Sequence, residues 1–511
     1  MTGIAAGAVT IAVAAIAASL MRLVRLTDAQ PSPVVAIGGA FIDITPAWLK
    51  DWAISTFGTA DKLVLVIAMA AVLAGLCATL GWLGAPAVLG GRGHPRWSIA
   101  IFVAVALLAG IVIVLRPAAG LLDVFPTMLG TAAGLLVIRA FWRTGQVHTD
   151  DQAPARRQVL GWAAGTTLAG AGAAIAADTL SPAVQQGHSS RVVLPPVAPL
   201  EIPATAQVAV ENMTPYITAN RDFYRVDTAL IPPNLAPADW QLRVHGLVER
   251  EIRMTFNDLM SEPMVESLTT LACVSNGVGG PLAGNAVWTG WPMRELLERA
   301  RPMPQADMVL STSIDGFTAS TPLSALTDNR NALLAVGMNG EPLPVEHGFP
   351  VRMVVPGLYG YVSATKWVVD LKLTRFADDV GYWTPRGWSA QAPIKTASRI
   401  DVPQPSAQVS SGEVVLAGVA WAQHRGISAV EVRVSPQVGE QGAWQRAELA
   451  DEPSIDSWRQ WIWRGAVEEP GRYTVSVRAI DGEANVQESA YAPPAPDGAT
   501  GHHTIYIYVQ P

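Results

Sequence analysis

The sequence carries little charge for its length. Of its 511 residues, 15% are Asp, Glu, Lys or Arg and 50% are hydrophobic, whereas a soluble domain carries about 25% charged residues. A wholly soluble enzyme is therefore excluded. The 42 acidic residues outnumber the 35 basic ones, and no block of Lys and Arg occurs, so the electrostatic footprint of a nucleic-acid-binding protein is missing. We expect no nucleic-acid partner.

Several cofactor motifs are also absent. Cys77 and Cys273 are the only cysteines, and two distant thiols cannot form a disulfide framework. There is no Cys-x-x-Cys-His run for a covalent haem, and no histidine falls in a long apolar stretch to hold a haem in a membrane. Neither a Walker motif nor a Gly-x-Gly-x-x-Gly between a strand and a helix occurs. Any phosphate must therefore be bound by side chains and ordinary loops.

The apolar residues concentrate in the first third of the chain. Five stretches approach the roughly 20 residues that cross a bilayer core, at residues 4–20, 63–83, 99–115, 121–141 and 159–177. The segment 31–58 is interrupted by Pro, Gly and Trp, and we interpret it as an interfacial or re-entrant loop. The sequence predicts about five transmembrane helices.

Basic residues predict the orientation of these helices, because loops rich in Lys and Arg stay in the cytoplasm. They gather in two loops, one with Arg92, His94 and Arg96 and the other with Arg139, Arg143, Arg156 and Arg157. Five crossings then place the long C-terminal portion outside the cytoplasm. Arg22 and Arg25 oppose this orientation of the first stretch.

Arg156-Arg157 directly precedes the fifth apolar stretch. This resembles a twin-arginine export signal placed inside the chain, although an ordinary positive flank has the same composition. About three domains are expected from the length. We predict a transmembrane region at 1–178, a linker at 179–209, and two globular domains at 210–400 and 401–511.

The two globular parts differ in pattern. From residue 210, short β-like runs alternate with Pro and Gly, and helical segments are few, chiefly 291–300 and 322–326. After a Pro-rich segment near 400–411, strand-like runs recur at 413–420, 429–435, 446–449, 458–464, 473–480 and 504–509. That spacing is typical of a small β-sandwich.

Two groups of residues in the first globular part have chemical potential. Cys273 ends a strand-like run and precedes a Gly/Ser/Asn loop, so it is an inert buried residue, a nucleophile or a metal ligand. Further along, His347 and Arg352 lie on a turn that leads into a buried strand, and Lys366 follows the next turn. Arg and Lys together suit a phosphate.

The loop after Cys273, the run from Val336 to Arg352 with its His-Gly-Phe-Pro-x-Arg segment, and Val354-Val-Pro-Gly357 followed by Lys366-Trp367 resemble the sulfite oxidase family of molybdopterin enzymes. The resemblance extends over residues 217–509, and the end of the chain is similar to that family's immunoglobulin-like dimerisation domain. Apolar stretches, internal twin-arginine and catalytic domain together resemble a membrane-bound actinobacterial-type subgroup. The implied fold is multidomain: all-α transmembrane helices, an α+β molybdopterin domain and an all-β immunoglobulin-like sandwich.

The resemblance assigns roles to individual residues. It implies that Cys273 is the thiolate ligand of molybdenum and that Arg225 and Arg459 reach the active site as further catalytic residues. The expected contacts to the pterin and its phosphate are Phe223, Tyr224, Arg225, Val226, Asp227, His347, Arg352, Ala364, Thr365 and Lys366, with Thr312 or Ser313 on a preceding strand. The implied cofactor is molybdenum-molybdopterin, which transfers an oxygen atom while cycling by two electrons.

Two positions depart from the family's pattern. Sulfite oxidases carry an arginine five residues after the cysteine, where this chain has Val278, and an active-site tyrosine where it has Phe317. The resemblance implies a small sulfur- or nitrogen-containing substrate, handled by a sulfite dehydrogenase or by a sulfoxide reductase, and the two departures lean away from the first. A non-catalytic cofactor-binding membrane scaffold and a membrane receptor are the alternatives from other classes. The resemblance also implies a separate electron-transfer partner and a possible homodimer.

Overall fold

The computed structural model describes residues 2–23, 33–46, 61–84, 93–115, 120–146, 191–229, 232–233 and 235–511, with single positions at 49, 52, 56, 161, 165 and 189. It forms two compact units. The first consists of Met1–Gly187 with Thr228–Leu235 and Ile314–Gly316, and the second consists of the remaining segments from His188 onward.

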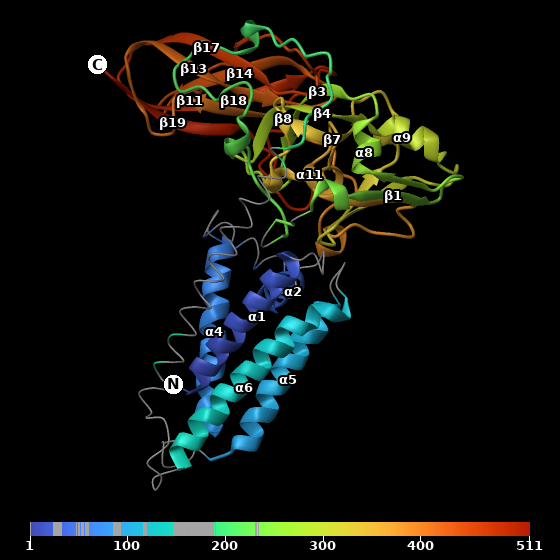
Figure 1. Cartoon of the computed structure of the whole chain (residues 1–511). Coiled ribbons are helices and arrows are strands. Elements are labelled where there is room, and N and C mark those ends of the chain that lie inside the picture. The colour runs from blue at the N-terminus through green and yellow to red at the C-terminus, as the bar shows by residue number, and fades with distance from the viewer. Residues whose placement is uncertain are drawn as a thin grey trace. The chain divides into compact units, whose positions relative to one another are not determined.

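The first unit is helical (Figure 1). Its helices are α1 (Thr2–Leu23), α2 (Pro33–Ile44), α4 (Asp61–Gly84), α5 (Pro95–Val114) and α6 (Phe125–Gln146). Four of them contain segments long and apolar enough to cross a membrane, namely Gly3–Met21, Ile67–Gly84, Arg96–Val114 and Leu121–Ala140. The first four predicted stretches are thus confirmed as helices. The fifth, at 159–177, and Arg156-Arg157 lie outside the described residues.

Part of the segment 31–58, which the sequence predicts as an interfacial or re-entrant loop, is helical. Residues 33–44 form α2, whose sequence is almost entirely apolar. With 12 residues it rises about 18 Å, which is too short to cross a bilayer core of about 30 Å. The proline begins this short helix and two glycines lie inside it, although both residue types have a low helix propensity.

The second unit begins with two sheets and short helices. The first sheet has the order β2 (Ile252–Thr255), β1 (Gln241–Gly246), β10 (Val368–Thr374), β5 (Met308–Ser313) and β6 (Thr318–Pro322). The second has the order β3 (Val265–Ala272), β4 (Ala283–Pro292), β7 (Leu333–Met338) and β8 (Glu341–Pro342), and β9 (Arg352–Val354) pairs with β7. The helices are α8 (Phe256–Met260), α9 (Met293–Ala300), α10 (Ser324–Thr327) and α11 (Gly360–Ser363).

The rest of the second unit consists of two further sheets. One has the order β11 (Ala397–Val402), β13 (Gly412–Trp421), β17 (Arg459–Val467) and β16 (Glu448–Leu449). The other has the order β12 (Gln408–Ser410), β19 (His503–Gln510), β18 (Gly471–Asp481), β14 (Ile427–Pro436) and β15 (Gln445–Arg446). The strand-like runs predicted beyond residue 412 are confirmed with two differences in their bounds: 446–449 forms two short strands, β15 and β16, in different sheets, and β17 begins at Arg459.

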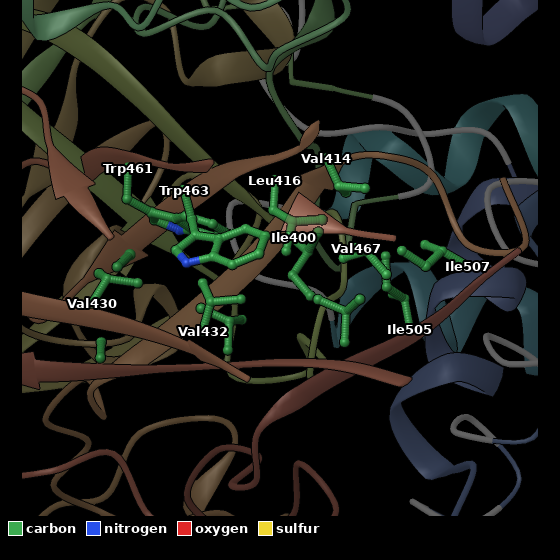
Figure 2. Packing of buried hydrophobic residues seen from close by; sticks show 14 of the residues in the cluster. Ile400, Val414, Leu416, Val430, Val432, Trp461, Trp463, Val467, Ile505 and Ile507 are labelled. Carbon is green, nitrogen blue, oxygen red and sulfur yellow. The ribbon is translucent and has the colours of Figure 1, made fainter. Parts of the chain in front are cut away.

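One hydrophobic core joins these two C-terminal sheets (Figure 2). Leu416 and Trp461 come from the first sheet, and Val432 and Ile507 come from the second. Alternate residues of β19 point into this core along its length. Trp461 and Trp463, two residues apart on β17, are both buried in it.

Candidate functional site

Cys273 lies directly after β3, in the loop that connects β3 to β4. Backbone hydrogen bonds close this loop: Cys273 N donates to the Leu282 carbonyl (2.9 Å), and Asn276 N donates to the Cys273 carbonyl (3.1 Å). The Asn276 side chain also accepts from Leu282 N at 2.9 Å. Cys273 is 9% exposed. A pair of antiparallel strands and a hydrogen-bonded loop therefore fix the thiol in place.

Burial raises the pKa of the Cys273 thiol, although hydrogen bonds from Ser275 lower it in part. Without a further positive charge the thiol stays protonated, because desolvation disfavours a thiolate. Among the described residues no group of three or more His, Cys, Asp or Glu could hold a metal ion. A metal at this place would thus have Cys273 as its protein ligand and would supply the charge that stabilises the thiolate.

A cavity of about 540 Å³ opens beside Cys273. Its wall contains Val278 and Gly279 from the Cys273 loop and Tyr359 from the turn before α11. The C-terminal sheets and their loops contribute charged side chains to the same wall, among them Arg425 and Asp481. A thiol and several polar groups converge here on a space of the size that small ligands occupy.

Phe223 and Tyr224 pack beside this region. Their rings stack at 5.2 Å, and Phe223 meets the rings of Trp288 (5.7 Å) and His347 (5.6 Å) edge-on. Burial raises the pKa of Tyr224, and the nearby Cys273 raises it further. The Tyr224 hydroxyl therefore stays neutral and can donate a hydrogen bond.

Arg352 is a buried cation that has no carboxylate partner among the residues that the structure describes. It is 5% exposed, and its guanidinium donates to the carbonyls of His347 (2.9 Å), Met353 (3.4 Å) and Ala364 (3.5 Å). It also lies 4.9 Å from the centre of the Trp288 ring. Burial lowers its pKa to about 10. Within the described residues Arg352 forms no ion pair, so its charge is compensated by backbone carbonyls and by the face of the Trp288 ring.

Lys366 lies in the same cluster and has one acidic partner. Its Nζ donates to Asp227 (2.7 Å) and to the Glu346 carbonyl (3.0 Å), and Arg225 donates to the same Asp227 carboxylate at 3.1 Å. Burial lowers the pKa of Lys366 to about 8, even though Asp227 raises it. Two cations thus share one carboxylate, and the cluster keeps a positive excess.

His347 is neutral at ordinary pH. Its Nε2 lies 2.9 Å from the Asn220 carbonyl, and burial, followed by the charge of Arg352, lowers its pKa to about 4. Nε2 therefore carries the proton that is donated to Asn220. The hydroxyl of Thr365, the residue before Lys366, lies 2.7 Å from the hydroxyl of Ser311.

Some predicted site residues lie elsewhere. Thr312 is on β5 opposite Asp370, and it is the neighbouring Ser311 that contacts Thr365. Val226 is 48% exposed. Arg459 donates to the carbonyls of Ala450 (2.7 Å) and Ile427 (2.8 Å) and is not among the residues that line the Cys273 cavity.

Arg425 and Lys395 line the cavity where Arg459 was expected. Both were missed, because the sequence shows no local motif around either residue. Their neighbours come from distant segments: Arg425 binds Asp481, which is 56 residues away, and Lys395 binds Asp497, which is 102 residues away. Only the three-dimensional fold brings these pairs to Cys273.

The residues present fit a molybdopterin cofactor. An anionic phosphate group suits Arg352, a buried guanidinium without a counter-ion, and a soft metal suits the Cys273 thiol. The cation excess around Lys366 adds to the attraction. The site therefore offers one thiol for the metal and several buried cations for the phosphate.

Known proteins share this part of the chain. Residues 229–383 match the family model described as an oxidoreductase molybdopterin binding domain. Mitochondrial sulfite oxidase of Mus musculus is 30% identical over 338 residues, which cover 57% of this chain and 61% of that protein. The uncharacterized oxidoreductase YuiH of Bacillus subtilis (strain 168) is 35% identical over 149 residues, which cover 29% of this chain and 72% of YuiH.

A third relative is the NADH nitrate reductase 1 of Oryza sativa subsp. japonica, 33% identical over 170 residues that cover 28% of this chain and 18% of that protein. The chain spans less than two thirds of the length of the mouse relative. The residues that match the family model include both the Cys273 loop and the His347–Arg352 turn.

Proposed function

The chain belongs to the sulfite oxidase family of molybdopterin-binding oxidoreductases, and we propose that it is a membrane-anchored enzyme whose catalytic part lies outside the cytoplasm. Its cofactor is molybdenum-molybdopterin. The proposed reaction is the transfer of an oxygen atom to or from a small sulfur- or nitrogen-containing substrate. The observation that carries the proposal is the Cys273 thiol on the wall of a cavity of about 540 Å³, close to buried cations.

In this proposal each side chain has a physical task. The bound cofactor supplies a metal centre that exchanges an oxygen atom while two electrons are taken up or released. Cys273 would hold the metal as a thiolate. Arg352 and Lys366 would hold the phosphate, because the attraction between a buried anion and buried cations offsets part of the desolvation cost of these charges.

The other predicted residues support this arrangement. Phe223 and Tyr224 exclude water from the buried cluster through their stacked rings. His347 and Thr365, through their bonds to Asn220 and Ser311, keep the two turns in position. Arg459 binds two backbone carbonyls and therefore acts as a positioning residue for the C-terminal sheets.

The domain plan supports a membrane-bound enzyme. Four apolar helices fall within the proposed transmembrane region 1–178, followed by the linker 179–209, the molybdopterin domain 210–400 and the C-terminal domain 401–511. We assign Arg156-Arg157 to an internal twin-arginine signal of the membrane-bound actinobacterial-type subgroup. This export route suits a domain that folds around its cofactor before it crosses the membrane.

The C-terminal sheets support further proposals. Two sheets that share one core fit an immunoglobulin-like domain that joins two copies of the chain. Sulfite oxidase and nitrate reductase are named for oxo compounds of sulfur and nitrogen, which supports a substrate of this kind. Electrons would pass to or from a separate partner protein.

The test combines metal analysis with one substitution. We expect detergent-purified protein from a cofactor-competent host to contain about one molybdenum and one pterin per chain. The Cys273→Ser variant should fold and keep the pterin but lose at least about a thousandfold in turnover with an artificial electron carrier, because the soft metal loses its thiolate. Cys77→Ser, the matched control in helix α4, should keep full activity.

Two outcomes would contradict the proposal. A fully active Cys273→Ser variant would remove the metal-ligand role. Absence of both molybdenum and pterin from the wild-type protein would indicate a scaffold or receptor.

A further inference from the structure

We propose that the Cys273 cavity selects an organic S-oxide or N-oxide that is neutral or positively charged, and that it disfavours small oxyanions such as sulfite. This inference rests on the proposed oxygen-atom transfer and specifies its substrate class. It follows from the charges on the cavity wall, from the partners of those charges and from the size of the space.

The two cations on the wall are already neutralised. Arg425 donates to Asp481 at 2.9 Å and also to the Ile394 carbonyl and the Thr396 hydroxyl. Lys395 donates to Asp497 and to the Gly498 carbonyl, both at 2.8 Å. Their hydrogen-bonding capacity is directed at the protein, so neither offers an uncompensated charge to an anion.

Asp481 remains ionised beside Arg425. Burial by itself would raise the pKa of Asp481, but hydrogen bonds from Asn485, Arg425 and Thr396 outweigh it and hold the pKa below its usual value. The guanidinium is therefore matched by a full negative charge at every pH near neutrality. An incoming dianion would have to displace that carboxylate.

Two further carboxylates on the wall have no cationic partner. Glu483 and Glu488 line the cavity and are exposed. The Glu483 carboxylate accepts from the Asn485 amide (3.4 Å), and that of Glu488 accepts from Ala490 N (2.9 Å). In the part of the chain that the structure describes, neither forms an ion pair. The wall thus carries three carboxylates against two cations, and a concave site focuses this excess.

The remaining wall suits an organic molecule. Val278, Tyr359, Trp421 and Val486 give it apolar surface. The volume of about 540 Å³ lies in the range of about 300–1,000 Å³ of ligand sites, and the metal end of the cofactor at Cys273 would share it with the substrate. A valine at position 278 supplies no charge for an oxyanion, whereas it can contact an alkyl group on sulfur or nitrogen.

The reaction for such a substrate is a two-electron reduction. The S–O or N–O bond breaks, and the oxygen leaves as water after taking up two protons. The substrate becomes a sulfide or an amine. The two electrons come from the separate electron-transfer partner, for which reduced viologen substitutes in the assay.

Binding of unreactive isosteres tests the charge preference without turnover. Methionine sulfone amide (positive), N-acetylmethionine sulfone methylamide (neutral) and N-acetylmethionine sulfone (negative) differ chiefly in charge, and calorimetry on the detergent-purified holoenzyme gives their Kd values. We expect the cation to bind at least about tenfold more tightly than the anion, with a difference that shrinks in high salt. Turnover of the three matching sulfoxides with reduced viologen should follow the same order.

Substitutions assign the preference to named residues. Glu483→Gln with Glu488→Gln should reduce the cation-to-anion ratio by about five- to tenfold, since each exposed charge contributes up to about fivefold. Val278→Arg should improve binding of the anionic sulfone and of sulfite. Glu468→Gln, an exposed glutamate after β17, is the matched control and should leave the ratio unchanged.

The outcomes separate this inference from the proposed function. Tighter binding of sulfite or of the anionic sulfone, or an unchanged ratio in the double glutamine variant, would overturn the charge preference while leaving an active molybdenum enzyme. Holoenzyme that turns over sulfite but none of the sulfoxides would overturn the substrate class. Loss of molybdenum, with the binding order intact, would contradict the proposed function and not the charge preference of the cavity.

Discussion

Arg352 and Arg425 are two arginines near Cys273 with opposite surroundings. Both donate to backbone carbonyls, but Arg425 also binds the buried Asp481 carboxylate at 2.9 Å, whereas Arg352 is buried without an ion pair among the described residues. A buried charge is tolerated when an opposite charge meets it. This difference supports an anion site at Arg352. The charge of Arg425, in contrast, is already paired with Asp481 within the protein. The difference separates the proposed phosphate site from the proposed substrate cavity.

The sharpest way to break this comparison is to replace each arginine by methionine. Arg425→Met leaves Asp481, whose side chain is 1% exposed, as a buried carboxylate without its cation. We expect a loss of about 3–5 kcal/mol in the free energy of unfolding. Urea denaturation of the purified protein, with and without cofactor, measures it.

Arg352→Met should behave differently in the two forms of the protein. Without cofactor, removal of an uncompensated buried charge should be neutral or stabilising. With cofactor available, the pterin content should fall at least about tenfold, because the phosphate loses its bidentate partner. Arg221→Ala, at an exposed arginine, is the control. Equal destabilisation by both methionine variants would show that the two arginines do not differ.

A smaller effect on stability and turnover is expected from a substitution in the Cys273 loop, which lines the cavity. Gly279 has φ +75°, and a Cβ there would overlap the ring of His503. The Nδ1 of His503 accepts from Ile400 N, so the ring cannot move freely. Gly279→Ala should cost about 1–3 kcal/mol and should lower turnover by displacing the Cys273 loop.

Gly277 provides the matched control. It lies two residues away in the same loop, and a Cβ there meets nothing within 4 Å. Gly277→Ala should therefore leave the Tm and turnover close to those of the wild type. If the two alanine variants have the same Tm, His503 does not hold the loop.

The sequence predicts some elements well because their signals are local. The runs 413–420 and 504–509 are rich in apolar and β-branched residues and are bounded by turns, and they form parts of β13 and β19. Strand β4 was missed, because its sequence AGNAVWTGWP lacks alternation and contains glycine. Its pairing with β3 and β7 on both sides imposes the extended conformation.

The functional site likewise combines residues that are close in the sequence with residues that only the fold brings together. His347 and Arg352 are five residues apart and contact each other through the His347 carbonyl, so a short motif is enough to find them. Arg425 and Asp481 meet only after β14 and β18 have paired, so the charge balance of the cavity is invisible in the sequence. The resemblance points to Arg459 in this part of the chain, and it gives no indication of Arg425.

The smallest expected effect concerns Lys366 and the pH dependence of the cofactor site. Its folded pKa of about 8 lies below the ordinary lysine value of about 10.4, so between these values the unfolded chain binds more protons than the folded one. The free energy of unfolding of the cofactor-free protein should therefore rise with pH across that window, by at most about 1.4 kcal/mol per pH unit. Cofactor retention should fall over the same window, because a phosphate favours the protonated amine. Lys366→Arg keeps the charge throughout and should abolish both slopes, as denaturation curves and pterin release at pH 7 to 10 would show. Identical stability slopes in the two proteins would mean that Lys366 does not titrate in this window. Identical slopes of pterin release would mean that Lys366 does not face the phosphate.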